Sequence, residues 1–512
     1  MRDPQTWRRL GLSALSGLLA ALAFPPLDLG PLVLVALTPL LWALRDARPR
    51  VALACGWVFG AALLAIVCSW IVFFGAVAIV PFVVWMGVYT AVAAFGGAWL
   101  ARAGVQGPWV WAALFTLAEY VRGRWPIGGL AWAELGVALH DLRPARALAS
   151  VGGVPLLTFL VVLVNAALVD AFVAMRARSS ERSCGWAAGV DLARAAATLG
   201  VALVVTLTAT ITWSNPPETG TITFALLQGN DENRYFTAAE MAAHPLTRKH
   251  LDLAAQLDGD IDLIVFPESS LDTDPFLDAR LREDLDAIAT DHDAVVLANA
   301  RVEGPENTVF NQNIAFGPDG DVLGTYSKRH LVPFGEYVPF PWLRNVIPAL
   351  SQIGRDYEPG EGPALFDVEG HPVGSVICFE STFPRSVADV VDEGAELIVV
   401  TTNNRSYRES ANSAQHVAMT QMRAAEFGRP FLHSAISGIT AVIDARGEVL
   451  QSTELFESTI VEGVIATTTG RTPYARLGDW VVLISALVLL GAVIAAVVRQ
   501  RRAAVTPAPS ES

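Results

Sequence analysis

Three β-rich runs of the chain each end in a side chain that is able to do acid–base or nucleophilic chemistry. They are Glu268 in DLIVFPES, Lys328 in GTYSKRH and Cys378 in GSVICFE. Loops that follow strands are where α/β folds usually collect catalytic groups. A cysteine nucleophile needs a base to take its proton, and a lysine ammonium lowers the energy of a nearby oxyanion. The three residues therefore form a chemically consistent set, with the backbone N–H of Phe379 as a candidate second oxyanion donor.

Each of the three residues also has a plainer interpretation, and the composition bears on two of them. Cys378 is the only cysteine in residues 214–477, and a free cysteine is often a buried core residue. The chain holds two lysines, Lys249 and Lys328, beside 34 arginines, so a retained lysine is of interest, although Lys249 fits a solvated helix face. Glu268 alone would fit a turn-capping carboxylate.

The composition divides the chain into membrane-like and soluble parts. Hydrophobic residues make up 53% of the chain and charged residues 17%, against about 25% charged in ordinary proteins. Residues 214–477 contain 39 acidic and 18 basic residues, which argues against nucleic-acid binding. We expect a membrane domain at 1–213, a soluble catalytic domain at 214–477, a C-terminal span with a basic end at 478–502, and a disordered tail at 503–512.

Apolar stretches in the membrane part predict eight spanning helices, because about 20 helical residues cross the hydrocarbon core. The second and fifth stretches are short, so a re-entrant or tilted segment is the alternative for each. Arginines gather on one side of these stretches, which places both termini in the cytoplasm and the acidic domain outside. An alternative with seven spans would put the soluble domain and the Arg499 cluster on sides of the membrane that do not fit the distribution of arginines. We expect Glu119, Arg122 and Arg124 to anchor the membrane interface. The stretches are Leu10–Phe24, Pro31–Leu44, Val51–Phe74, Ala76–Leu100, Pro108–Val121, Val151–Met175, Ala195–Trp213 and Trp480–Val498.

Residues 214–477 show short β-rich runs and intervening helical patterns, separated by Gly, Pro and Asp. This alternation, together with hairpins such as Gly317–Gly320, predicts an α/β fold in which two sheets are faced by helices, an α-β-β-α sandwich. The expected strands are Ile222–Leu227, Leu263–Phe266, Ala294–Ala300, Gln312–Phe316, Val322–Ser327, Pro363–Val368, His371–Ile377, Leu397–Thr401, Phe431–Ala435, Thr440–Ile443 and Val461–Ala466. The expected helices are Ala238–Leu257, Leu277–Thr290, Pro384–Glu393 and Ser413–Phe427.

The motifs FPES, YSKRHLVPFGEYVP and VICFES, in this order and spacing, resemble those of the nitrilase superfamily with its Glu-Lys-Cys triad. Together with the eight apolar stretches, they resemble the apolipoprotein N-acyltransferases, and the resemblance covers nearly the whole chain. It implies Glu268 as general base, Lys328 as oxyanion stabiliser and Cys378 as acyl-accepting nucleophile. It also implies Glu336 as a supporting carboxylate near the triad and Glu380 just after the nucleophile.

The sequence departs from this family at two places beside the nucleophile. Phe379 stands where the family often has tyrosine, so a hydroxyl is lost there. The residues Asn403–Tyr407, NNRSY, stand where the family has Asn-Asp-Ala-Trp-Phe. The missing tryptophan affects the expected acyl-chain contacts and lid behaviour, whereas the chemistry of the triad is unaffected.

The resemblance implies a ping-pong reaction in the plasma membrane of a bacterium, with the catalytic domain outside. An acyl chain would pass from a phospholipid to Cys378 as a thioester, and then to the α-amine of the diacylglyceryl-cysteine of a lipoprotein. Loops such as Val332–Trp342 would exclude water. We expect a monomer without cofactor, metal or nucleic acid, in which His330 and His416 are only loop or core hydrogen-bonders. The alternatives are a membrane-tethered amidase acting on a small C–N substrate and a non-catalytic scaffold or transporter.

Overall fold

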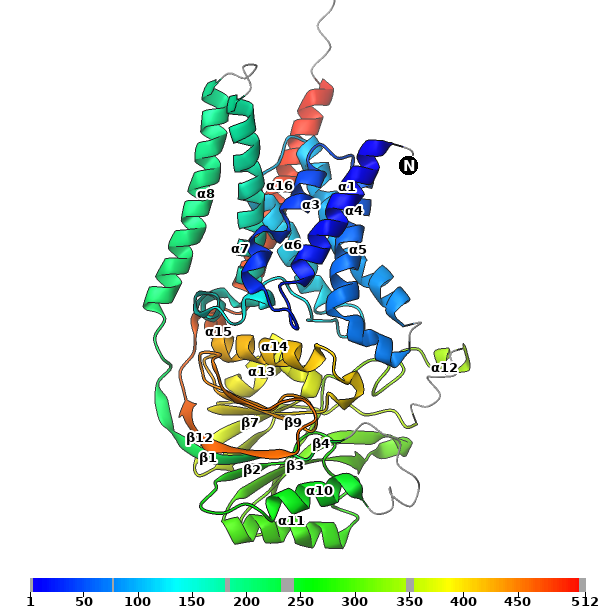
Figure 1. The fold of residues 1–512 in the computed structure, drawn as a ribbon, viewed down its shortest axis with the longest axis vertical. Coiled ribbons are helices and arrows are strands. Elements are labelled where there is room, and N and C mark those ends of the chain that lie inside the picture. Colours follow the sequence, from blue (N-terminus) through cyan, green and yellow to red (C-terminus); the bar gives the residue numbers. More distant parts are fainter. Residues whose placement is uncertain (1–2, 76–77, 180–184, 232–243, 347–353, 506–512) are drawn as a thin grey trace, which may run out of the picture. The chain divides into compact units, whose positions relative to one another are not determined.

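The computed structural model describes residues 3–75, 78–179, 185–231, 244–346 and 354–505. The chain divides into two compact units (Figure 1). One unit joins Met1–Trp213 to Leu477–Ser512, and the other contains Ser214–Arg476.

In the described residues of the first unit the regular elements are all helices, and five of them are long and apolar enough to cross a membrane. These five are Pro49–Val67, Ile79–Arg102, Arg143–Arg178, Gly189–Thr212 and Trp480–Arg502. The helices are α1 (Pro4–Ala21), η1 (Gly30–Leu32), α2 (Val33–Ala36), α3 (Thr38–Leu44), α4 (Pro49–Val67), η2 (Ser69–Phe74), α5 (Ile79–Arg102), α6 (Pro108–Arg122), η3 (Val137–Leu139), α7 (Arg143–Ser179), α8 (Gly185–Thr212) and α16 (Trp480–Val505).

The other three expected stretches are not among these five long apolar helices, but they too contain helices. Leu10–Phe24 corresponds to α1 and Pro108–Val121 to α6, whereas Pro31–Leu44 is divided among η1, α2 and α3. A count of eight spans therefore stays a prediction. Of the expected tail, residues 503–505 continue α16, and the rest lies outside the described residues.

The charged residues at the end of α6 are placed differently from the interface anchors that the sequence suggests. Glu119 is 7% exposed and Arg122 is 2% exposed, so both are buried inside the unit. Glu119 accepts hydrogen bonds from the Thr158 hydroxyl at 2.7 Å and from the Leu135 N–H at 3.0 Å. The anchoring expectation is wrong for these two residues, because partners on neighbouring segments satisfy them inside the protein.

The second unit contains two six-stranded sheets with strand orders β12-β1-β2-β3-β4-β5 and β11-β10-β9-β8-β7-β6. In the first sheet β1, β2 and β3 are parallel, and in the second β7, β8 and β9 are parallel. The strands are β1 (Glu218–Gln228), β2 (Leu263–Val265), β3 (Val295–Glu303), β4 (Val309–Phe316), β5 (Val322–Ser327), β6 (Leu365–Val368), β7 (His371–Ile377), β8 (Leu397–Thr402), β9 (Phe431–Ala435), β10 (Ala441–Ile443), β11 (Val449–Ser452) and β12 (Thr459–Thr468).

The sheets lie face to face, with one pair of helices against each outer face (Figure 1). α10 and α11 cover the first sheet, and α13 and α14 cover the second. The helices and short turns of this unit are α10 (Pro245–Ala254), α11 (Ala279–His292), η4 (Pro305–Asn307), α12 (Leu343–Val346), η6 (Cys378–Thr382), α13 (Pro384–Asp392), η7 (Arg405–Tyr407), α14 (Asn412–Phe427) and α15 (Pro473–Leu477). The α-β-β-α sandwich expected from the sequence is therefore confirmed.

Strand alternation explains why this sandwich has three apolar layers. Leu263 and Val265 of β2 pack into the layer between the sheets, whereas Ile264 between them packs against the helix side. In β7, Ile377 likewise faces the other sheet and Val376 faces the helices. In the sequence, strands that are buried on both faces are continuous apolar runs. Each fully buried side chain of this kind stabilises the folded state by about 1.5–3 kcal/mol.

Most expected elements of this unit match the structure to within a few residues. Val322–Ser327, His371–Ile377 and Phe431–Ala435 are strands with the expected bounds, whereas β11 was not expected. The expected helix Ala238–Leu257 lies partly outside the described residues, and α10 begins at Pro245.

Candidate active site

Three strand ends deliver Glu268, Lys328 and Cys378 to one place in the sandwich. Glu268 follows β2 of the first sheet, Lys328 comes directly after β5, and Cys378 comes directly after β7 of the second sheet. Lys328 Nζ lies 3.4 Å from Glu268 Oε1. The thiol of Cys378 lies close enough for both of these charges to act on its pKa.

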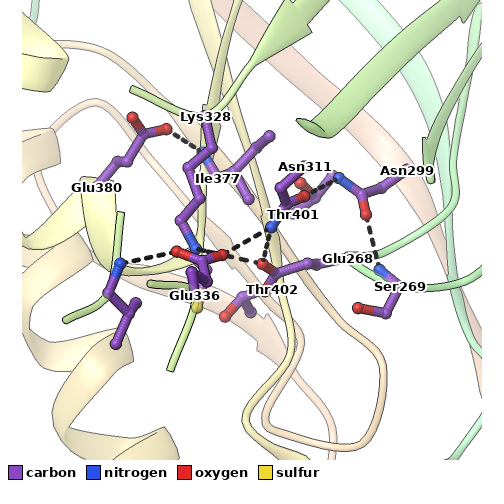
Figure 2. Close-up of polar contacts among 12 residues, drawn as sticks. Glu268, Ser269, Asn299, Asn311, Lys328, Glu336, Ile377, Glu380, Thr401 and Thr402 are labelled. Atoms are coloured by element: carbon purple, nitrogen blue, oxygen red, sulfur yellow. Dashed lines mark hydrogen bonds and ion pairs between the residues drawn. The ribbon is translucent and has the colours of Figure 1, made fainter. Parts of the chain in front are cut away.

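Lys328 is held between two carboxylates, as Figure 2 shows. Its ammonium lies 2.8 Å from Glu336 Oε1, in addition to its contact with Glu268. Lys328 is 1% exposed, Glu268 5% and Glu336 9%, so water contributes little to their solvation. Burial by itself lowers the pKa of Lys328, but the negative charges of Glu268 and Glu336 outweigh burial and hold this pKa well above its usual value. Lys328 is therefore a permanent cation at physiological pH.

Asn311 joins the two carboxylates from the neighbouring strand (Figure 2). Its Nδ2 donates to Glu268 Oε1 at 2.7 Å and to Glu336 Oε1 at 3.0 Å. Its backbone carbonyl accepts from the Lys328 N–H at 2.9 Å, because the pairing of β4 with β5 puts these residues opposite each other. One strand register thus positions the lysine and both of its carboxylate partners.

A row of buried asparagines supports Asn311 from the adjacent strands. Asn299 Nδ2 donates to Asn311 Oδ1 at 2.9 Å, and Asn299 Oδ1 accepts from the Ser269 N–H at 2.8 Å, next to Glu268. Asn313 donates to the Ser375 hydroxyl at 2.8 Å and so connects the two sheets. The expected site residues did not include these amides. The available signal was the pair Asn311 and Asn313, which lie on one face of a strand that is apolar at Val309, Phe310 and residues 314–316. Amides on a buried face must be paired.

Cys378 has a strained backbone at the turn from β7 into η6. Its φ is +51°, a left-handed conformation that costs a non-glycine residue about 1–3 kcal/mol. Burial raises the pKa of the thiol to about 12 and the charge of Glu268 adds to this, while Lys328, the Thr402 side chain and the Asn403 backbone lower it. The thiol is therefore protonated at neutral pH and needs a base before it can act as a nucleophile.

Glu380, two residues after Cys378, is fully buried and bonded to neutral groups. It accepts from the Tyr326 hydroxyl at 2.8 Å and from the Ile377 N–H at 2.8 Å. The Arg329 and His330 N–H groups bond its other oxygen at 2.8 Å and 2.9 Å. Burial raises the pKa of Glu380, and these hydrogen bonds partly offset that shift. Its contacts connect the segment after Lys328 to the turn that carries the thiol.

The two places where the sequence departs from the resembled family are held by contacts of their own. The Phe379 ring lies 5.6 Å from the His330 ring and 4.8 Å from the Phe383 ring, so aromatic packing holds it in place of a hydroxyl. In the stretch Asn403–Tyr407, Arg405 pairs with buried Asp231 and fixes the loop that follows β8.

One group of residues in the helical unit has metal-ligand character. Asp28, His140 and Asp141 place one ligand atom each within 4.8 Å of one another. The two ring nitrogens of His140 lie 3.1 Å from Asp28 and 3.2 Å from Asp141. The carboxylates raise the pKa of His140 to about 9 despite its burial, so a doubly protonated ring between two carboxylates accounts for this geometry.

Comparison with known proteins matches both units of the chain to known families. The carbon-nitrogen hydrolase family matches residues 223–474, and the N-terminal domain of apolipoprotein N-acyltransferases matches residues 16–167. An apolipoprotein N-acyltransferase of Geobacter metallireducens is 30% identical over 96% of this chain and 95% of its own length. Those of Pseudomonas syringae pv. tomato and Photobacterium profundum are 30% and 28% identical, covering 94% and 92% of this chain and 95% and 92% of their own lengths.

The second unit is thus a carbon-nitrogen hydrolase domain. The helical unit of the same chain matches the N-terminal domain of apolipoprotein N-acyltransferases. The chain belongs to the apolipoprotein N-acyltransferase family. This confirms the family expected from the motifs and favours an acyltransferase over the small-substrate amidase and scaffold alternatives. The apolar helices agree with a membrane protein.

Proposed function

We propose that this protein moves an acyl chain from a membrane phospholipid to the α-amine of the diacylglyceryl-cysteine at the N-terminus of a lipoprotein. Cys378 carries the acyl group as a thioester, Glu268 is the general base and Lys328 stabilises the oxyanion. The observation that carries this proposal is the buried ammonium of Lys328, 3.4 Å from Glu268 and close enough to the thiol to lower its pKa.

In the first half-reaction Glu268 takes the proton of the Cys378 thiol, and the sulfur attacks the ester carbonyl carbon of the phospholipid. The negative charge that develops on the carbonyl oxygen is stabilised by Lys328 and by the Phe379 backbone N–H. The C–O bond then breaks, and protonated Glu268 returns its proton to the leaving glycerol oxygen. The products are a thioester on Cys378 and a lysophospholipid.

In the second half-reaction the lipoprotein amine attacks the thioester carbonyl. Glu268 takes a proton from the attacking nitrogen, and Lys328 again stabilises the oxyanion. The C–S bond breaks and the sulfur recovers a proton, so that the thiol and the carboxylate return to their starting state. The net change is one ester bond broken and one amide bond formed.

The supporting residues have separate tasks in this scheme. Glu336 holds the Lys328 ammonium at 2.8 Å and accepts from the Val332 N–H at 2.7 Å. It therefore keeps the lysine in place when Glu268 becomes neutral by taking a proton. Glu380 holds the Cys378 turn through its bond to Ile377. Phe379 contributes its backbone N–H and an aromatic wall beside the nucleophile.

Water has to be kept away from the thioester, because hydrolysis would turn the enzyme into a lipase. The loop Val332–Trp342 follows Lys328 and presents Phe340 and Trp342, which are 46% and 61% exposed. Exposed aromatic residues of this kind suit a lid that meets lipid. We assign this loop to the exclusion of water and to contact with the acyl chain.

The proposal includes a topology in the bacterial plasma membrane. The positive-inside distribution of arginine supports both termini in the cytoplasm and the catalytic domain on the extracytoplasmic face. Such a domain meets phospholipid and lipoprotein substrates at the same bilayer surface, which gives the reaction a proximity advantage. We assign the active form to a monomer, since all the proposed catalytic groups come from one chain.

Intact-protein mass spectrometry tests the first half-reaction. Wild-type protein purified with phospholipid should carry an acyl-chain mass that hydroxylamine removes. Cys378→Ala should carry none, and Cys378→Ser serves as the near-isosteric control for folding and lipid binding. Folded, lipid-bound wild-type protein without an adduct would reject the thioester and favour the amidase or scaffold alternatives.

A further inference from the structure

A buried histidine that the proposed mechanism does not use lies against the backbone of the nucleophile. His416, in the second turn of α14, is 1% exposed. Its Nε2 lies 2.8 Å from Ser381 Oγ and 3.0 Å from the carbonyl oxygen of Cys378. The sequence suggested only an ordinary hydrogen-bonder for His416, whereas the structure gives it a defined partner on the proposed catalytic residue.

The hydrogen bonds define the protonation of this ring. A carbonyl oxygen only accepts, so Nε2 must carry the hydrogen that points to Cys378. The Ser381 hydroxyl donates to the same carbonyl at 3.1 Å, which leaves its oxygen free to accept from Nε2. On the other side, Nδ1 lies 3.4 Å from the amide nitrogen of Asn404 and acts as the acceptor. Burial lowers the pKa of His416 to about 4, which agrees with a neutral ring.

The carbonyl of Cys378 is a point where the turn needs such support. A positive φ at a residue with a β-carbon is strained and persists only when the surroundings enforce it. His416 and Ser381 both bond the oxygen of this residue, while Glu380 bonds the N–H of the preceding Ile377. These contacts hold the peptide plane that follows the thiol-bearing carbon and the peptide that precedes Ile377, and they thereby limit the direction of the thiol.

We propose that His416 is a positioning residue for acyl transfer, which holds the strained Cys378 backbone so that the thiol faces Glu268 and Lys328. This inference rests on the proposed function of Cys378 as the acyl carrier. His416 acts through the carbonyl of Cys378 and takes no proton in either half-reaction. The donor on Nε2 is therefore the part of the side chain that matters.

Two amide substitutions separate this role from plain core packing. In His416→Gln the side-chain amide nitrogen reaches about as far as Nε2 and can donate to Cys378, whereas in His416→Asn it reaches only about as far as Nδ1. Both variants are polar, neutral and smaller than histidine. His433 provides a matched control, because its buried ring packs 4.8 Å from that of His416 but its bonded partner is Thr420.

The experiment measures the rate constant of acyl-enzyme formation in a single turnover with phospholipid, by quenching and intact-mass detection, on variants with matched melting curves. We expect His416→Asn to be about 100-fold slower than wild type, the usual effect of a misplaced reacting group. His416→Gln should recover most of the rate, and His433→Asn should remain close to wild type. If His416→Asn fails to fold, Ser381→Ala provides the second test and should also slow acylation.

Three results would overturn the proposal. They are equal loss in His416→Gln and His416→Asn, wild-type rates in every variant, and a loss in His433→Asn as large as that in His416→Asn. An unchanged rate in Ser381→Ala, used when His416→Asn does not fold, counts against it in the same way. Absence of any adduct on wild-type protein is a different outcome, because that would refute the thioester itself.

Discussion

Two groups of buried residues meet at Cys378, and they differ in where their hydrogen bonds come from. The first, which we term the charged cluster, consists of Glu268, Asn311, Lys328 and Glu336, and its carboxylates share one ammonium. The second, which we term the support cluster, consists of Glu380, Ser381 and His416. Its carboxylate is bonded by backbone N–H groups and a phenol, and its hydroxyl and imidazole bond the backbone carbonyl of the nucleophile.

This difference indicates different tasks for the same kind of side chain. A carboxylate beside a cation is held in its ionised form, and the pair can balance charge that appears during a reaction. A carboxylate that accepts four neutral donors is fixed by them and fixes them in turn. We therefore expect changes in the charged cluster to affect the rate of chemistry, and changes in the support cluster to affect stability and the placement of the thiol.

The largest effect is expected from Glu268→Gln in the charged cluster. Gln keeps the shape of the side chain but cannot take the thiol proton, so acyl-enzyme formation should slow by about 10²–10⁴-fold. The melting temperature should change little, since Lys328 retains Glu336 as its counter-ion. Single-turnover acylation and a thermal melt, measured side by side, check both parts. If Glu268→Gln lost stability but acylated at the normal rate, the assignment of the charged cluster to the chemistry would be contradicted.

The pH dependence of thiol alkylation gives a second, smaller effect. The pKa of Cys378 is raised to about 12, so only a minute fraction of the thiol is ionised at pH 7, and that fraction rises with pH. The iodoacetamide rate, followed by mass spectrometry in the absence of substrate, should increase about tenfold per pH unit between pH 7 and pH 9. A rate that is flat over this range would mean that Lys328 already stabilises a thiolate.

Glu380→Gln in the support cluster should mainly lower stability. The new amide group would face N–H and O–H donors that now bond a carboxylate, and each buried donor left unpaired costs about 1–3 kcal/mol. We expect a loss of about 2–4 kcal/mol in the free energy of unfolding. Denaturant unfolding of the detergent-solubilised protein measures it, and Glu369→Gln at an exposed turn residue serves as the control. Unchanged stability would show that Glu380 does not fix the turn.

The smallest effect is expected from Glu336→Gln, which removes one of the two negative charges beside Lys328. Glu268 still holds the lysine in the resting state, but protonated Glu268 would leave it unpaired during the reaction. We expect about a tenfold loss in acylation rate, or about 1.4 kcal/mol of transition-state stabilisation. A loss as large as that of Glu268→Gln would assign Glu336 a direct part in proton transfer.

Much of the second unit could be predicted from the sequence because its strands are short apolar runs bounded by Gly, Pro and Asp. The proposed site residues were recognisable because Glu268, Lys328 and Cys378 each follow such a run. The edge strand β11 was missed because only one of its four residues is partly buried and the rest are exposed, so it carries no apolar pattern.

The roles of several buried polar residues could not be predicted from the sequence, because their partners are distant in the chain. Asn311 becomes significant only when the β4–β5 register places it beside Lys328, and His416 only when α14 packs against η6. Glu119 was taken for an interface anchor because its partner Thr158 lies on another helix. Periodicity describes which face a residue occupies, and it does not describe which polar group meets it there.

The most direct test of the whole account is a chase of the isolated acyl-enzyme with a synthetic diacylglyceryl-cysteinyl peptide. The account predicts that the protein loses the acyl mass, the peptide gains the same mass on its α-amine, and an N-acetylated peptide leaves the adduct in place. If the acyl group instead appears as free fatty acid at the same rate with or without peptide, or stays on the protein, transfer through Cys378 is contradicted.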